Sequence, residues 1–484
     1  MAIKAGKKKA KSETYLYRQI AQDTIDAIQR DDYSVGDRLP SLRAVCKIYA
    51  VSLATAVQAY QLLYDQGWAS VRHKSGYRAK NPVIREITAP EVSRPHFKSM
   101  KANVSEMAMS LVSEVRQKRL IKLGAAVPQP SLLPLSSLAR TMAGCARRHY
   151  LDVAAYTDYT GYRPLRQQIV RLMHDAGVRC HSDDIIITNG CLEALNLALR
   201  AVATPGDSVA IESPTYFGIL QIIEALGLRA LELPTHVTLG IDLAALEVAI
   251  QKKSLKACVL MPSFANPTGS MMPVENRRSV VELLARHQIP LIEDDVYGVL
   301  SYTNHRPRAL KSYDAEQNVI YCSSFSKTIA PGLRVGWILP GRLMERIGYL
   351  KFLDNIGNAI HPQMALAELL AKGSYRRNIR HAAMVYRHRM GRLREWVSRY
   401  FPEGTRISDP QGGFLLWVEL PETVDSFKLY HAAMEHNIAI TPGILFSVQS
   451  QYTNHIRLSC GAVEDDVAER SIKKLATLMM GLHE

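Results

Sequence analysis

The sequence lacks the cysteine patterns that bind metals or form a disulfide framework. Its seven cysteines are odd in number and scattered, and no two of them form a C-x-x-C motif. A closed zinc site needs Cys and His residues clustered at metal-ligand spacing, so the sequence predicts no metal site. Thiols that stay reduced are typical of the cytosol, where we expect the protein.

Long apolar runs are also absent. No run approaches the roughly 18 residues that a membrane helix needs. The basic N-terminus, Met1 to Ser12, is not followed by the apolar core of a secretory signal. The sequence therefore predicts no membrane span and a cytoplasmic location.

The composition is that of a globular protein. Of the 484 residues, 47% are hydrophobic and 22% are charged, which argues against disorder over most of the length. A chain this long exceeds one ordinary domain, so we expect two or three folded units.

Positive charge is concentrated near the N-terminus. The net charge is +15, and residues 1–80 hold fourteen Lys and Arg against seven Asp and Glu. The other 404 residues hold 46 against 38, so nearly half of the excess lies in a sixth of the chain. This asymmetry favours an N-terminal unit that binds a polyanion, with nucleic acid as the leading candidate.

The first 80 residues read as a flexible basic tail, residues 1–13, followed by a small helical unit, residues 14–80. Ser41 and Ser52 are candidate N-caps of two short helices joined by a tight turn. Such a pair predicts a helix-turn-helix, whose second helix enters the DNA major groove. Residues 68–78 then alternate and turn at Ser75-Gly76, which is typical of a β-wing. A dimerisation module is the alternative.

This unit resembles the winged-helix domain of GntR-type transcription regulators. The likeness lies in Gly36-Asp37-Arg38-Leu39-Pro40-Ser41-Leu42-Arg43, Val51-Ser52, Ala59-Tyr60 and Ser75-Gly76-Tyr77. The helix-turn-helix and the resemblance together imply DNA contacts by Arg38, Arg43, Ser52, Thr55, Gln58, Arg72, Lys74 and Gly76. The chain departs from many members at Leu53, where they have an arginine, so one contact differs.

Residues 81–118 read as a linker. The segment contains Pro82, Pro90 and Pro95, mixed charges and no sustained apolar period until a short helix with Met107, Leu111 and Val115 on one face. It is either a tether that lets the flanking units move or an inert spacer.

From about residue 119 strands alternate with helices, which predicts an α/β fold with a mostly parallel sheet. Five apolar strands end next to residues with reactive or polar groups: Gly190, Tyr216, Asn266, Asp294 and Lys327. Ligands collect at the carboxyl ends of parallel strands, so these residues, with Tyr297 close behind Asp294, are expected to form one site. Each motif alone also has an ordinary explanation. Gly190 could be needed only for a chain reversal, Asp294 could cap a helix, and Lys327 could simply be exposed to solvent.

Together these residues indicate which chemical groups a ligand of the site would carry. The Gly190 turn, nearby hydroxyls and Arg334 suit a phosphate, because helix N-termini bind anions. Asp294 suits a protonated ring nitrogen, and Asn266 and Tyr297 suit a ring hydroxylate. A flat ring stacks on Tyr216, and an aldehyde needs the Lys327 amine. Pyridoxal 5′-phosphate meets every requirement.

These motifs are similar to those of fold-type I aminotransferases over residues 119–484, with a core at about 150–345 and a smaller C-terminal α+β subdomain at about 346–484. The resemblance implies that Lys327 is the catalytic Schiff-base lysine and Asp294 the pyridinium partner. It implies phosphate contacts by Ser324, Ser326, Arg334 and the N–H groups of Gly190, Cys191 and Leu192. Tyr156 resembles a tyrosine that reaches the phosphate of a neighbouring subunit, so a homodimer is expected. Arg457 resembles the arginine that binds a substrate carboxylate.

A winged helix joined to an aminotransferase-like body resembles the MocR subfamily of GntR-type bacterial regulators. The first hypothesis is therefore a regulator that binds double-stranded DNA, holds pyridoxal phosphate on Lys327 and senses a vitamer or an amino compound. The second is an active aminotransferase that carries a DNA-binding module, since Lys327 and Arg457 are both present. A body without cofactor that serves only as a scaffold is disfavoured by the intact set.

Overall fold

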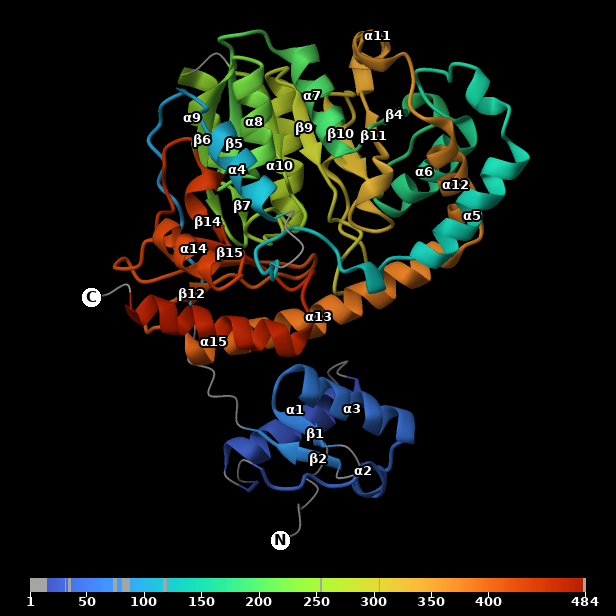
Figure 1. Ribbon diagram of the computed structural model, residues 1–484. Coiled ribbons are helices and arrows are strands. Elements are labelled where there is room, and N and C mark those ends of the chain that lie inside the picture. The colour runs from blue at the N-terminus through green and yellow to red at the C-terminus, as the bar shows by residue number, and fades with distance from the viewer. Residues whose placement is uncertain are drawn as a thin grey trace. The chain divides into compact units, whose positions relative to one another are not determined.

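The structure is a computed structural model that describes residues 15–30, 32–33, 36–72, 76–80, 88–115, 120–252, 255–303 and 305–481. Two compact units make up the chain: Met1–Glu86 with Gly391–Arg399, and Ile87–Met390 with Tyr400–Glu484. Figure 1 traces both units. Within the described ranges every helix is too short or too polar to cross a bilayer. The predicted basic tail, residues 1–13, lies outside these ranges.

The first unit is a winged helix-turn-helix, as predicted. Its elements are α1 (Leu16–Gln29), α2 (Leu42–Tyr49), α3 (Leu53–Asp65), β1 (Ala69–Arg72) and β2 (Gly76–Ala79). Both expected caps form, because the Ser41 Oγ accepts a hydrogen bond from the Ala44 N–H and the Ser52 Oγ accepts one from the Thr55 N–H, each at 3.2 Å. These bonds satisfy backbone donors that a helix start leaves unpaired.

The core of this unit lies under one face of α3. Ala56, Ala59 and Leu63 are fully buried there, at the spacing of three and four that places residues on one helix face. Tyr60 packs edge-on against Tyr77 of β2, with ring centroids 4.9 Å apart. The opposite face of α3 is thereby left exposed.

The second unit is built on one large mixed sheet. Its strands run in the order β3-β6-β5-β8-β9-β10-β11-β4, and β7 pairs with β6. Their bounds are β3 (Met100–Lys101), β4 (Ile186–Thr188), β5 (Ser208–Ser213), β6 (Arg229–His236), β7 (Gly240–Ile241), β8 (Leu255–Leu260), β9 (Leu291–Asp294), β10 (Val319–Ser324) and β11 (Gly336–Leu339).

The middle of this sheet is parallel. Strands β6, β5, β8, β9 and β10 pair in parallel, whereas β11 runs antiparallel to both β10 and β4. Strand β4 therefore points the same way as β10, and their carboxyl ends share one edge. The predicted α/β class with a mostly parallel sheet is confirmed.

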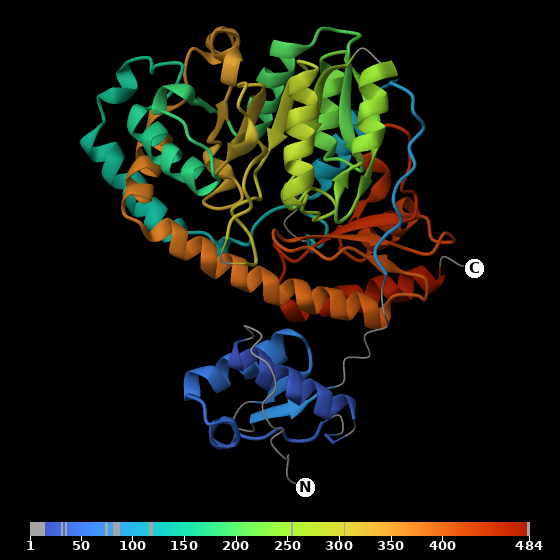
Figure 2. The same cartoon turned by 180° about the vertical axis from the view of Figure 1, so that it is seen from behind.

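Helices cover both faces of the sheet, as comparison of Figures 1 and 2 shows. One face carries α7 (Cys191–Val202) and α8 (Phe217–Ala225), and the other carries α9 (Leu243–Lys252) and α10 (Val274–Arg286). Beyond β4 lie α5 (Leu135–Arg148), α6 (Arg163–Asp175), α11 (Met344–Asn355) and α12 (Ile360–Ala371). Burial on both faces explains why the central strands are continuously apolar.

A smaller α+β part follows the long helix α13 (Ser374–Tyr400). Its antiparallel sheet has the order β12-β13-β15-β14, with bounds β12 (Arg406–Ile407), β13 (Leu415–Glu419), β14 (Thr441–Pro442) and β15 (His455–Ser459). Helices α14 (Ser426–Glu435) and α15 (Asp465–Gly481) complete it.

Residues 88–115, part of the predicted linker, belong to the second unit. Strand β3 extends the large sheet by pairing with β6, and α4 (Ser105–Val115) follows. The Glu224 carboxylate receives three hydrogen bonds here, from the Val104 N–H at 2.8 Å and from the Ser105 N–H and Oγ at 3.1 and 2.9 Å. Residues 81–87, and the side chains of Leu111 and Val115, lie outside the described structure.

Replacing Glu224 tests how this segment is held. Glu224→Ala should speed amide hydrogen exchange in residues 99–108 by at least about tenfold, because it leaves two backbone N–H groups without an acceptor. Hydrogen-exchange mass spectrometry measures this directly. The exposed Glu247→Ala on α9 is the matched control, and equal exchange in the two variants would contradict the assignment.

Candidate functional site

The structure brings the predicted strand-end residues to one edge of the large sheet. Gly190 follows β4, Tyr216 follows β5, Asn266 lies in the loop after β8, Asp294 ends β9, and Lys327 follows β10. Since these five strands point the same way, their carboxyl ends meet at a common edge. The remaining contacts define what that edge can hold.

Asp294 is a buried carboxylate. Its side chain accepts a hydrogen bond from the Cys191 thiol at 3.4 Å, and a thiol is a weak donor. Burial raises the pKa of Asp294 to about 7, since a charged carboxylate is costly in a poorly solvated place. A cation beside Asp294 would offset that cost.

Lys327 lies partly buried, and its charge interacts with that of Asp294. Its Nζ donates a hydrogen bond to the carbonyl of Ala126 at 2.7 Å and lies 5.8 Å from the centre of the Tyr297 ring. Burial lowers the pKa of Lys327 to about 8, and the positive charge of Arg457 contributes to the same shift. The amine is therefore available to a carbonyl compound near neutral pH.

Arg457, on β15, reaches into the site from the smaller α+β part. Its Nη1 donates to the Asn266 Oδ1 at 2.8 Å, and its Nη2 and Nε donate to the carbonyl of Gly124 at 2.8 and 3.2 Å. The guanidinium lies 5.2 Å from the ring centre of Phe446, and burial lowers the Arg457 pKa to about 10. A buried cation with this orientation suits a carboxylate.

The turn before α7 forms an anion-binding corner. Gly190 has φ +86°, and among the described residues no side chain caps the first N–H groups of α7, which suits an anion there. A Cβ on Gly190 would lie 2.5 Å from the Arg334 Nη2. Arg334 donates from Nη2 to the Asn189 carbonyl at 2.9 Å and from Nη1 to the Ser326 Oγ at 3.5 Å.

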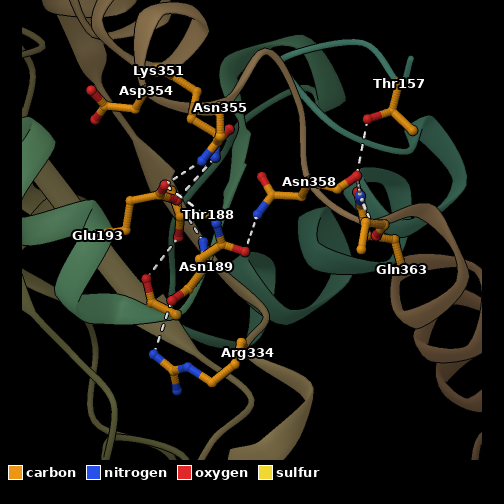
Figure 3. A network of polar contacts seen from close by, with 12 residues as sticks. Thr157, Thr188, Asn189, Glu193, Arg334, Lys351, Asp354, Asn355, Asn358 and Gln363 are labelled. Carbon is orange, nitrogen blue, oxygen red and sulfur yellow. Dashed lines mark hydrogen bonds and ion pairs between the residues drawn. The ribbon is translucent and has the colours of Figure 1, made fainter.

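A polar network fixes this corner from behind, as Figure 3 shows. The Glu193 carboxylate accepts hydrogen bonds from the Asn189 N–H at 2.6 Å, from the buried Lys351 Nζ at 2.9 Å and from the Asn355 Nδ2 at 2.7 Å. The Asn358 Nδ2 donates to the Asn189 Oδ1 at 2.6 Å. Because Glu193 and Lys351 form an ion pair, their burial leaves neither charge without a partner.

The free polar groups of the site fit pyridoxal 5′-phosphate. The Tyr297 Oη is buried and has no hydrogen-bond partner among the described residues, so it can donate to a ring hydroxylate. Asp294 can pair with a protonated ring nitrogen, and Tyr216 lies partly buried beside the site, where burial raises its pKa to about 12. Ser324, the last residue of β10, and Ser326, in the loop that presents Lys327, are both buried.

Tyr156 is not part of this group within one chain. Its side chain is 87% exposed. The adjacent Thr157 donates from Oγ1 to the Asn358 carbonyl at 3.0 Å, so the segment is attached to the network behind the phosphate corner.

The predicted DNA contacts lie on the first unit. Arg38, Arg43, Ser52, Gln58 and Gly76 are exposed, and Thr55 is half-buried. The Ser52 and Thr55 hydroxyls lie 2.9 Å apart at the start of α3. Gly76 opens β2 with φ +77°. The Arg72 side chain and all of Lys74 lie outside the described structure.

Sequence reasoning missed several residues that shape the site. The carbonyls of Gly124 and Ala126 hold Arg457 and Lys327, and a backbone acceptor leaves no side-chain pattern to find. Glu193 pairs with Lys351 across 158 positions of the chain, which no local spacing indicates.

Fold and site together are those of a winged helix-turn-helix regulator with an aminotransferase-like body. The family model for aminotransferase class I and II matches residues 147–475. The model for bacterial regulatory proteins of the gntR family matches residues 16–78.

Full-length relatives share both parts. The chain is 35% identical over 464 residues to the uncharacterized HTH-type transcriptional regulator YjiR of Escherichia coli, covering 95% of this chain and 97% of the relative. It is 34% identical to YdcR of the same organism, covering 96% and 98%. The chain belongs to the MocR-type transcription regulators, which join a GntR helix-turn-helix to an aminotransferase class I and II domain.

A solved structure resembles the body alone. The α-aminoadipate aminotransferase LysN of Thermus thermophilus, complexed with N-(5′-phosphopyridoxyl)-L-leucine, superposes with a TM-score of 0.71 at 28% identity. The match covers 78% of this chain and 99% of LysN. The pyridoxal phosphate expected from the sequence is thus the cofactor of this domain class.

Gly190→Ala should weaken cofactor binding by at least about tenfold, because the new Cβ would displace Arg334 from the corner. Gly206→Ala is the matched control, since Gly206 has φ +93° but open space around its Cβ position. Both variants should lose about 1–2 kcal/mol of unfolding free energy to backbone strain. Absorbance titration with pyridoxal phosphate measures the affinities, and equal affinities would contradict the role of the corner.

The lowered pKa of Lys327 sets the pH dependence of cofactor loading. With a pKa of about 8, about one amine in ten is unprotonated at pH 7, against about one in a few thousand for an ordinary lysine. The rate at which the cofactor-free chain takes up pyridoxal phosphate should rise with pH and level off above about pH 8. Arg457→Gln should move the plateau to higher pH, and a wild-type rate still rising at pH 10 would contradict the shift.

Proposed function

We propose that this regulator holds pyridoxal phosphate on Lys327 and changes its affinity for DNA when an amino compound reaches the cofactor. The proposal rests chiefly on one observation. At one edge of the sheet, the buried Asp294 has a raised pKa, the buried Tyr297 hydroxyl has no hydrogen-bond partner among the described residues, and Lys327 has a lowered pKa.

Each part of the cofactor has a counterpart in the site. The N–H groups of Gly190, Cys191 and Leu192, with Ser324, Ser326 and Arg334, would hold the phosphate. Asp294 would keep the ring nitrogen protonated, Asn266 and Tyr297 would face the ring oxygen, and Tyr216 would stack on the ring. When bound, the cofactor supplies an aldehyde that captures amines and a ring that withdraws electrons from them.

Arg457 would orient an effector that carries a carboxylate. Its guanidinium is held by Asn266 and Gly124, so little reorganisation is needed when a carboxylate arrives. An amino acid offers both the amine for Lys327's cofactor and the carboxylate for Arg457. We therefore infer an amino acid or a closely related amino compound as the effector.

The exposed face of α3 would enter the major groove. Ser52 and Thr55 lie at the start of this helix, and Gln58 lies one turn further on, which is the part that reads bases in helix-turn-helix proteins. Arg38 and Arg43 would contact phosphates, as would the wing residues Arg72, Lys74 and Gly76. A DNA-bound regulator would reside in the cytoplasm, at the bacterial nucleoid.

A homodimer would complete the cofactor site. Tyr156 and Tyr159 are exposed, and so are Tyr349, Phe352 and Leu353 on α11. The two segments are neighbours, because a Cβ on Gly348 would lie 3.0 Å from the Tyr159 ring. An exposed apolar surface of this kind is typical of subunit interfaces, and Tyr156 would then reach the partner's phosphate.

The test is DNA affinity in the presence of amino compounds. Fluorescence anisotropy with the DNA upstream of the gene should show an affinity change of about 5- to 150-fold when the cofactor-loaded chain meets its effector, drawn from a panel of amino acids. Lys327→Ala should keep DNA binding and lose the response. Lys252→Ala, on the exposed side of α9, should retain both.

Arg43→Ala in the same assay should weaken DNA binding and reduce its salt dependence. A response that survives Lys327→Ala, or no response to any amino compound, would contradict the proposal. Amino transfer with many turnovers at about 1 per second or faster would instead favour the active aminotransferase.

A further inference from the structure

A second cavity lies in the same unit, away from the cofactor edge. Its volume is about 420 Å³, within the range of small-molecule sites. Its walls come from α6, from the loop after β9 and from the first turns of α13. None of the residues assigned to the cofactor lines it.

One cation on the wall of this cavity is unpaired. Arg306 is already engaged by Asp295 at 2.6 Å, and Arg376 pairs with Asp175 at 2.9 Å. Arg380 makes no hydrogen bond or ion pair with any residue that the structure describes. Asp175 is the only acidic residue among those that line the cavity, against three arginines, so the net charge of the lining is positive.

The rest of the lining is mostly apolar. Leu172, Val299, Ile379 and Ala383 contribute hydrocarbon, and Met384 stands 67% exposed beside them. Transfer of an apolar group from water to such a surface is favourable in proportion to the area covered. A ligand with an apolar body and one negative charge matches both features.

The floor of the cavity adjoins the cofactor site through the backbone. Arg306 and the Tyr321 Oη both bond to the Asp295 Oδ2, at 2.6 and 2.9 Å. Asp295 directly follows Asp294, the last residue of β9. Asp295 therefore connects Arg306, which lines the cavity, with the neighbouring Asp294 of the cofactor edge.

We propose that this cavity is a second ligand site, which binds a small carboxylate with an apolar body. The carboxylate pairs with Arg380 at the wall, and the apolar body lies against Ile379, Ala383 and Met384. The site is separate from the Arg457 site, and its occupation does not require the cofactor.

Calorimetric titration of the full chain with phenylacetate tests the assignment. Arg380→Gln should weaken one binding event by about tenfold, the size of a charge-assisted contact. Met384→Glu, a change at an exposed position that places a negative charge at the cavity, should weaken the same event. Arg377→Gln, at an exposed arginine three residues before Arg380 on α13 and not part of the lining, should leave it unchanged.

Two further measurements separate this site from others. The event should persist in Arg457→Gln, which removes the carboxylate partner of the cofactor site, and neutral phenylacetamide should bind at least about tenfold more weakly than phenylacetate. Phenylacetate binding that is unchanged in both Arg380→Gln and Met384→Glu, or that is lost in Arg457→Gln, would overturn the proposal. Since the titration does not need pyridoxal phosphate, its failure is distinct from failure of the proposed function.

Discussion

The buried carboxylate of Asp294 is the constraint on which the cofactor edge depends. A carboxylate in a poorly solvated place is unfavourable unless a cation or several donors face it. Among the described residues, the Cys191 thiol, the Val296 N–H and the Lys327 charge favour the ionised form of Asp294, yet burial still raises its pKa to about 7. The same desolvation lowers the pKa of Lys327 and of Arg457. One ligand that brings a ring cation, an aldehyde and a phosphate satisfies these groups together, which explains why they occupy one edge.

The strand directions in the large sheet bring these groups to one edge. Strands β4, β9 and β10 point the same way although β11 runs between β4 and β10, so the Gly190 corner, Asp294 and Lys327 share an edge. Behind the corner, Glu193 and Lys351 join α7 to α11. The exposed apolar residues of α11 thus lie on the element that supports the Gly190 corner, so the proposed subunit interface and the proposed phosphate site would share one support.

The parts predicted from sequence are those with local or periodic signals. The caps at Ser41 and Ser52 are set by neighbours within three residues, and buried parallel strands are recognisable as apolar runs. The two-residue strand β3 falls within the segment predicted to be a linker, because so short a strand has no detectable period. Contacts to the carbonyls of Gly124 and Ala126 carry no side-chain signature at all, and only the fold reveals them.

The central claim is that Lys327 carries pyridoxal phosphate in the regulator itself. The most direct measurement is reduction of the cofactor-loaded chain with borohydride, followed by peptide mapping by mass spectrometry. A phosphopyridoxyl group on the peptide that contains Lys327 is the predicted result. A chain without a phosphopyridoxyl group, or one that carries the group on another lysine such as Lys311, would contradict the account.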